Sequence, residues 1–178
     1  MSGPAEALHW LAAGLYGLAV AWAVVCDARW LLIPNWTAAT AALAFPPAAV
    51  IAGLAPAAIA WHLGVGIGLL AGGAVLFGRG ILGGGDVKLL AAVGVWIGPD
   101  DLLAYLVAVS LLGGVLALAV MAAGRLKRRW PALAAVPWLG QGRPGTQAIP
   151  YGIAIGLAGL LLLARNPALP AAWAAALP

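Results

Sequence analysis

Two aspartates are the residues of this chain whose type and setting could do chemistry. Asp86 follows three consecutive glycines, and Asp27 ends the first apolar segment. The chain has only five acidic residues among 178, and a carboxylate beside long apolar segments is unfavourable unless it faces partners, water or a working site. Two carboxylates held close together cannot both ionise easily, which leaves a protonated acid beside a carboxylate base. Such a pair activates water and polarises a peptide carbonyl, so these residues predict an aspartic hydrolase site.

The composition places this chemistry in a membrane. The hydrophobic fraction is 65%, the charged fraction is 8% and the mean hydropathy is +1.05. These values are typical of a polytopic membrane protein rather than a soluble domain. The net charge of +4 could indicate nucleic-acid binding, but eight of the nine basic residues can be placed on one side of a bilayer. We therefore assign the charge to topology and expect no nucleic acid as a partner.

Six apolar segments predict an all-α fold, a bundle of six transmembrane helices joined by short loops. The expected helices cover residues 6–26, 36–54, 57–77, 81–98, 102–123 and 149–164. The first has 21 residues and rises about 31 Å, enough to cross a hydrocarbon core of about 30 Å. Pro46 and Pro47 are expected to kink the second helix. Residues 1–178 are treated as a single membrane domain, with its core at about 10–164 and a Pro/Ala-rich tail at 165–178.

The apolar segment after Asp86 is short. From Val87 to Gly98 it has 12 residues, or about 18 Å of helix, too little to cross a bilayer. Starting instead at Ile81 gives 18 residues. We therefore expect Gly83 to Asp86 to lie at membrane depth near one face, as irregular backbone sheltered by protein or water. The glycines would also give an extended substrate room to approach Asp86.

The basic residues set the predicted orientation. With six spans, the loops at 27–35, 78–88 and 124–148 share one side of the membrane, and both termini share the other. The first side collects Arg29, Arg79, Lys88, Arg125, Lys127, Arg128, Arg129 and Arg143. The second side has only Arg165. By the positive-inside rule the first side is cytoplasmic and the termini are external.

This orientation brings Asp27 and Asp86 to the same cytoplasmic face. The basic cluster at 125–129 is expected to bind anionic lipid and to fix the topology. No basic region precedes the first apolar run, so we expect that run to stay in the protein rather than to be cleaved as a signal peptide.

Other polar or small residues have structural interpretations. Cys26 is the single cysteine, lacks a CxxC or histidine partner at metal-ligand spacing, and is expected to be buried and inert. His62 is expected to be packed or interfacial rather than a ligand. Asp101 precedes the fifth apolar segment, where it can cap free amides. Gly68 and Gly72 have the GxxxG spacing that allows helices to approach closely.

Three stretches resemble motifs of the type IV prepilin peptidases, a family of GxGD membrane aspartic peptidases. Residues 83–88 resemble the GxGDxK motif, residues 27–35 resemble the family's other aspartate segment, D-x-[RK]-x-x-x-I-P-N, and residues 149–152 resemble the proline-aromatic-glycine opening of its last helix. The positions concerned are Asp27, Arg29, Ile33, Pro34, Asn35, Gly83, Gly85, Asp86, Lys88, Pro150 and Gly152. The resemblance covers about residues 10–164, with six spans in the expected order.

The resemblance implies an aspartic endopeptidase in the inner membrane. It would remove a short, basic leader from a prepilin or pseudopilin at the cytoplasmic face, just before the hydrophobic N-terminal helix of the substrate and commonly after a glycine. Asp27 and Asp86 would be the catalytic pair. Lys88, Arg29 and Asn35 would orient or anchor, although Lys88 could equally be a helix-end lysine that snorkels to the interface.

The chain departs from the longer members of that family. Those carry a large insert with paired CxxC motifs between the first two spans, and they also methylate the new pilin N-terminus. Here the connection has nine residues and the chain has one cysteine. We therefore expect no zinc or other cofactor and no methyltransferase activity. The short form is similar to the peptidases of tight-adherence (Flp-type) pilus systems.

Other interpretations remain open. A presenilin-type protease shares the GxGD motif but pairs it with a Tyr-Asp on the preceding helix, whereas Asp27 lies three spans earlier and follows Cys26. A small transporter or channel-like protein could use Asp86 and Lys88 in an ion path, although the central thirds of the six segments are nearly devoid of polar residues. A purely structural role for the protein would not explain why two carboxylates lie beside its apolar segments.

Overall fold

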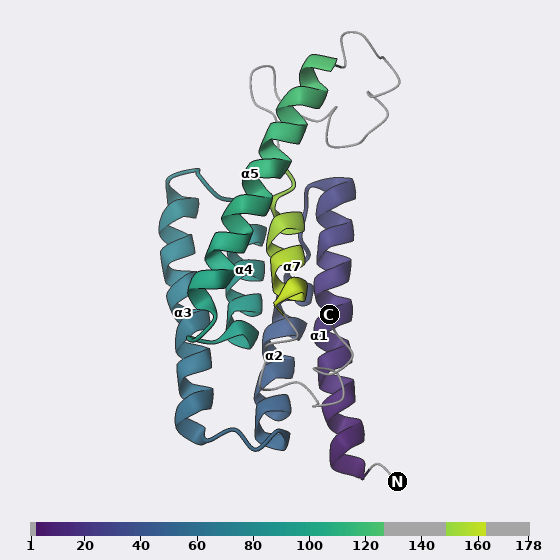
Figure 1. The fold of residues 1–178 in the computed structure, drawn as a ribbon, viewed down its shortest axis with the longest axis vertical. Helices are drawn as coiled ribbons and strands as arrows, with labels where there is room; N and C mark the ends of the chain where they lie inside the picture. The colour runs from purple at the N-terminus through teal and green to yellow at the C-terminus, as the bar shows by residue number, and fades with distance from the viewer. Residues whose placement is uncertain (1–2, 127–148, 163–178) are drawn as a thin grey trace.

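The computed structural model describes residues 3–126 and 149–162. These residues form helices and connections, with no strand among them, which confirms the all-α prediction (Figure 1). The helices are α1 (Pro4–Trp30), α2 (Asn35–Ile51), α3 (Pro56–Gly78), α4 (Gly84–Ile97), α5 (Leu102–Leu126) and α7 (Tyr151–Leu161). The basic cluster at 125–129 and the tail at 165–178 lie largely or wholly outside the described residues.

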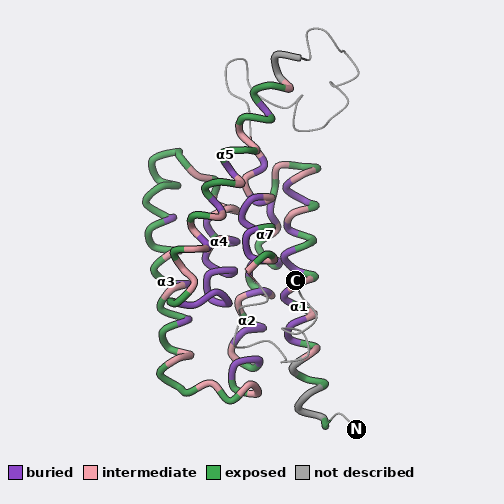
Figure 2. The backbone as a smooth tube through the Cα atoms, viewed as in Figure 1, coloured by how far each residue is buried: buried purple, intermediate pink, exposed green. Residues whose placement is uncertain are grey.

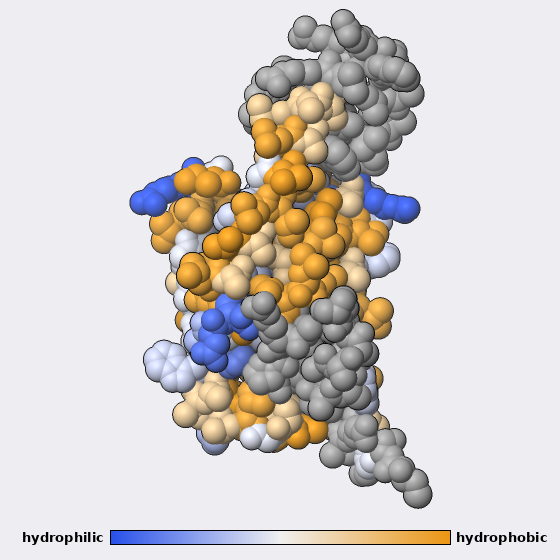
Figure 3. All heavy atoms as spheres, in the orientation of Figure 1, coloured by the Kyte–Doolittle hydropathy of each residue, from blue (hydrophilic) through white to orange (hydrophobic). Residues whose placement is uncertain are grey.

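Three helical stretches are long and apolar enough to cross a membrane: Trp10–Trp30, Pro56–Gly78 and Leu102–Ala123. The others are shorter, since α2 has 17 residues, α4 has 14 and α7 has 11. The outer surface suits a lipid environment, because large apolar side chains such as Leu103 and Leu118 of α5 are exposed (Figure 3). These features fit a membrane protein, whereas six crossings stay a prediction.

The first helix extends further than the sequence predicts. It continues through Asp27 to Trp30, because no glycine or proline lies between Asp27 and Pro34. Leu31 ends it with a left-handed φ of 53°, and its N–H donates to the Asp27 carbonyl at 3.0 Å. Pro34 is extended and comes directly before α2. The predicted loop at 27–35 is therefore too long, since only residues 31–34 connect the two helices, and Asp27 is held in the last turns of α1.

The expected irregular glycine run is also corrected. Only Gly83 is extended, and α4 begins at Gly84, so Asp86 lies in the first helical turn. The glycines serve close packing instead: a Cβ at Gly84 would lie 3.2 Å from the Phe77 ring, and one at Gly85 would lie 3.0 Å from Ile33 Cβ. Gly84 and Gly85 therefore allow Phe77 and Ile33 to pack closely against the beginning of α4.

The shortest of the first five helices, α4, lies at the centre of the bundle. It packs against α2, α3 and α7, and nine of its 14 residues are buried (Figure 2). Trp96 fixes its far end: Nε1 donates to the Ala41 carbonyl at 2.7 Å, and the indole lies 4.4 Å from the Tyr16 ring and 5.6 Å from the Phe45 ring. Because α4 is anchored on both α1 and α2, its first turn is held in place relative to α1.

Small residues on α3 bring it against α4, but not the ones that the sequence predicts. Gly68 and Gly72 have no neighbour within 4 Å of the position that a Cβ would occupy, so they face outward and make no close approach within the described residues. Gly66 and Gly73 make the close approach to α4 instead, because a Cβ at either position would overlap a valine of α4. Pro46 and Pro47 lie inside α2, which continues as a helix from Asn35 to Ile51.

The predicted burial of Cys26 and packing of His62 are confirmed. Cys26 is free and buried. His62 is buried, with its Nδ1 at 2.8 Å from the Val95 carbonyl oxygen and its ring stacked on Phe45 at 4.9 Å. Asp101 comes directly before α5, and its carbonyl accepts from the Tyr105 N–H at 2.9 Å. Cys26 directly precedes Asp27, but neither it nor His62 nor Asp101 lines the cavity at the two aspartates.

Candidate active site

Asp27 lies where the end of α1 meets the beginning of α7. Its side chain is 5% exposed. The backbone amides of Gly152 and Ile153, in the first turn of α7, interact with its carboxyl group. Amides in a first helical turn have no partner within their own helix and carry the positive end of the helix dipole. The beginning of α7 therefore provides a natural place for one carboxylate.

Asp86 lies in the first turn of α4. Its carboxyl group interacts with the backbone amides of Gly83 and Gly152. The interaction with Gly83 resembles a capping box, in which an acidic side chain at the third helical position reaches back to the N-cap amide. Gly83 allows this geometry because a Cβ there would lie 2.6 Å from Asp86 Oδ2. A single glycine amide, that of Gly152, thus interacts with both aspartates.

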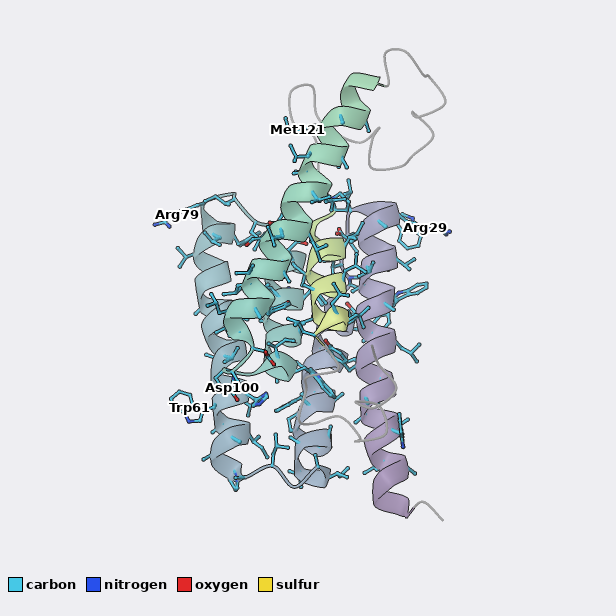
Figure 4. All side chains as sticks on the ribbon, in the orientation of Figure 1. Arg29, Trp61, Arg79, Asp100 and Met121 are labelled. Atoms are coloured by element: carbon cyan, nitrogen blue, oxygen red, sulfur yellow. The ribbon has the colours of Figure 1, made fainter. Side chains whose placement is uncertain are left out.

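The two carboxyl groups form one site. They are close enough to interact electrostatically, and both line a cavity of about 210 Å³ with Leu31, Leu32, Ile33 and residues 83–85. This cavity lies at the end of the bundle where α1 finishes and α4 begins. Arg29 and Arg79 mark the same end and point outward (Figure 4). The structure therefore brings together the two aspartates that the sequence analysis singled out.

Each carboxyl group keeps one buried oxygen without a hydrogen-bond partner among the described residues: Oδ2 of Asp27 and Oδ1 of Asp86. Buried polar atoms in folded proteins are normally hydrogen-bonded, and leaving one unpaired is unfavourable by about 1–3 kcal/mol. Two such acceptors in one cavity serve no packing purpose. Their free acceptor capacity is available to a water molecule or a substrate group that enters the cavity, as general acid–base chemistry requires.

The supporting residues divide into two groups. Ile33 is buried and contacts both Gly85 and Gly152, so it fills the space between α4 and α7. Pro150 is fully buried and precedes α7. By contrast, Lys88 and Asn35 are exposed and contact each other, with Lys88 Nζ donating to Asn35 Oδ1 at 2.8 Å. This hydrogen bond joins α4 to α2.

Arg29 is not brought to the cavity. It is exposed at the end of α1 and is absent from the cavity lining, so any role it has would be exerted from the surface. In the other direction, sequence reasoning missed Leu31, Leu32 and the Ile153 amide. The leucines give no distinguishing pattern, but the amide could have been found, since Pro150 marks a helix start and such starts attract carboxylates.

No group of three or more potential metal ligands is found within residues 3–126 and 149–162. Two aspartates from separate helices, a shared backbone amide and an apolar helical bundle define the class of protein: a membrane protein with a paired-carboxylate site at one end of its helices.

The model of the type IV leader peptidase family matches residues 14–118, more than half of the chain. The chain therefore belongs to the type IV leader peptidase family, which confirms the family predicted from the motifs. Membership makes it a peptidase in general terms, with a prepilin-type substrate. The matched region contains Asp27 and Asp86 and ends within α5, so α7 lies beyond it. No curated protein and no solved structure matches the chain significantly.

Proposed function

We propose that this chain is an aspartic endopeptidase that removes the leader from type IV prepilin-like substrates, with Asp27 and Asp86 as its catalytic pair. One observation carries the proposal: the two aspartates, 59 positions apart in the numbering of the chain, line a single cavity and share the Gly152 amide. Family membership supports the peptidase activity, and the paired carboxyls support the aspartic mechanism.

In the proposed reaction one carboxyl is ionised and the other is protonated. The ionised carboxylate takes a proton from water while the water oxygen attacks the scissile carbonyl carbon, and the protonated carboxyl gives its proton to the carbonyl oxygen. The resulting diol returns a hydroxyl proton to the second carboxyl as the carbonyl re-forms. The C–N bond breaks, the nitrogen takes the proton held by the first carboxyl, and both aspartates return to their starting states.

We further propose that the cavity opens at the cytoplasmic face of the inner membrane in a multi-pass protein with both termini external. The exposed Arg29 and Arg79 at the same end support this orientation (Figure 4). The connection between α1 and α2 is confined to residues 31–34, which supports the prediction that this short form lacks methyltransferase activity.

The decisive experiment is cleavage of a prepilin by the purified full chain in lipid nanodiscs. Asp27→Asn and Asp86→Asn keep side-chain size but remove the ability to exchange protons, and we expect each to lower the cleavage rate by at least about a hundredfold. Asp100→Asn is the matched control, because Asp100 is exposed beyond the opposite end of α4, and it should retain wild-type turnover.

Retained cleavage by Asp86→Asn would exclude the proposed mechanism. The transporter alternative makes a different forecast: proteoliposomes would show ion or solute flux that disappears with Asp86→Asn, without peptidase activity. Among the described residues, the buried side chains that carry polar groups include Thr37, His62 and Trp96 as well as Asp27 and the tyrosines Tyr16 and Tyr105. Thr37, His62 and Trp96 each pair with a backbone carbonyl, an arrangement that serves packing and gives the transporter alternative no specific support.

A further inference from the structure

A second hollow lies between α2 and α3, both of which pack against α4. Its volume is about 410 Å³, within the usual range of small-molecule pockets. Small side chains form it, including Ala39 and Ala42 of α2, Gly66 of α3 and Ala92 of α4. We call this hollow the α2–α3 groove. It differs from the aspartate cavity, with which it shares no lining residue.

The groove opens to the outside of the bundle. Ala39 and Ile67 are exposed on opposite walls, whereas Ala92 is buried at its floor. In a chain whose outer surface is apolar, this opening faces lipid rather than water. Hydrocarbon must fill it there, because an unfilled apolar hollow forfeits the dispersion contacts of its walls.

One end of the groove is cationic. Lys88 and Asn35 line it at the end nearest the aspartate pair. Lys88 uses one donor for its 2.8 Å hydrogen bond to Asn35, and an ammonium group has three. The exposed Arg29 and Arg79 lie at the same end of the bundle (Figure 4). A ligand with an apolar chain and an anionic head would match the groove from end to end.

The charge at one end favours a lipid over an apolar helix. From Lys88 to Val95 the floor rises about 10 Å, and the walls along it are mostly apolar, whereas the ammonium group of Lys88 lies at one end. A phospholipid has an acyl chain and an anionic phosphate in the same order, and lysine ammonium groups bind phosphate.

We propose that the α2–α3 groove binds an anionic phospholipid, with an acyl chain along α4 and the phosphate at Lys88. This site is independent of the peptidase chemistry proposed for the aspartates. It gives Lys88 a role at the lipid interface, where its hydrogen bond to Asn35 holds the ammonium at the mouth of the groove.

The test uses the full chain in nanodiscs of equal phosphatidylglycerol and phosphatidylcholine, extracted into mild detergent and weighed by native mass spectrometry. Ala39→Trp fills the groove and should lower retained phosphatidylglycerol by about tenfold, since each displaced methylene weakens binding. Ala119→Trp, at an exposed alanine of α5 outside the groove, should retain as much lipid as wild type. Lys88→Gln should lower the preference for phosphatidylglycerol by about fivefold, the effect of one lysine near an anionic surface.

Photocrosslinking with a phosphatidylglycerol that carries a photoreactive acyl chain is a second measurement. It can be made on the wild-type chain, so it does not depend on whether a variant folds correctly. Its crosslinks should map to the α3 peptide containing Ile67 and be lost in Ala39→Trp. Equal retention by Ala39→Trp and Ala119→Trp, or crosslinks spread evenly over α3 and α5, would overturn the proposal. Unchanged headgroup preference in Lys88→Gln would refute the assignment of the phosphate to Lys88.

Discussion

At the scale of single residues, the aspartate site depends on a backbone amide as much as on its carboxyl groups. Gly152 interacts with both carboxyls, and it can do so because it has no side chain. A Cβ at this position would lie 2.8 Å from Asp27 Oδ2 and 2.6 Å from Ile33 Cδ1. A methyl group there must displace either the reactive carboxyl or the isoleucine that separates α4 from α7.

We therefore predict that Gly152→Ala lowers kcat for leader cleavage by about a hundredfold, the effect of a misplacement of about 1 Å at a reacting group. KM should change little, because the substitution acts on the carboxyl pair. Rates at several concentrations of a prepilin substrate separate the two constants. Gly114→Ala is the control, since Gly114 lies within α5 with no neighbour within 4 Å of its Cβ position.

A double substitution separates positioning from packing. In Gly152→Ala the new methyl group would meet both Ile33 Cδ1 and Asp27 Oδ2. Ile33→Val removes the Cδ1 atom, so that only the contact between the methyl group and Asp27 is left. If Gly152 positions the carboxyl, Gly152→Ala combined with Ile33→Val stays slow. Recovery of wild-type kcat in the double variant would show that Gly152 matters only for packing against Ile33.

At the scale of helices, α4 positions Asp86 because both of its ends are fixed. Trp96 anchors the far end through its hydrogen bond to Ala41, and α3 lies closely along the rest through Gly66 and Gly73. The contact at Gly73 is with Val87, the residue directly after Asp86, so packing between α3 and α4 bears on the site itself.

Two adjacent glycines of α3 should respond oppositely to the same change. Gly73→Ala places a methyl 2.7 Å from Val87 Cγ1, and we expect a loss of about 1–3 kcal/mol in the free energy of unfolding from overpacking. Gly72→Ala meets nothing within 4 Å and should stabilise by about 0.4–1 kcal/mol, because alanine restricts the unfolded chain. Thermal unfolding in detergent measures both, and equal shifts in Tm would contradict this packing of α3 on α4.

The sequence predicts helices better than it predicts which of their faces meet. Long apolar runs bounded by proline and glycine locate five of the helices to within a few residues, and the two aspartates stand out because charge is rare. The GxxxG spacing predicted a close helix approach at Gly68 and Gly72, whereas Gly66 and Gly73 make the contact with α4. Spacing along one helix does not indicate which of its sides faces a neighbouring helix. The Gly152 amide was missed as a partner of both carboxyls because its role depends on three helices converging.

At the scale of the whole molecule, charge is unequal between the two ends. Arg29, Arg79 and Lys88 are exposed near the aspartate pair, whereas Asp100 is exposed beyond the far end of α4. Cations concentrate on the cytoplasmic side of membrane proteins, so this distribution predicts that a leader would reach the cavity from the cytoplasm. The basic leader and the acidic pair would then attract each other at that surface.

The orientation can be read from the two ends of α3, which is long and apolar enough to cross a membrane. Cys26 is the only cysteine and is buried, so Cys26→Ala gives a cysteine-free background. Single cysteines can then be placed at Ala55 and Ile81, which are exposed and lie beyond opposite ends of α3.

A membrane-impermeant maleimide should label Ala55→Cys in cells whose outer membrane has been permeabilised. It should label Ile81→Cys only in inverted vesicles. Labelling of both positions from one side would mean that α3 does not cross, and the reverse pattern would place the aspartate cavity outside the cytoplasm, where a cytoplasmic leader could not reach it.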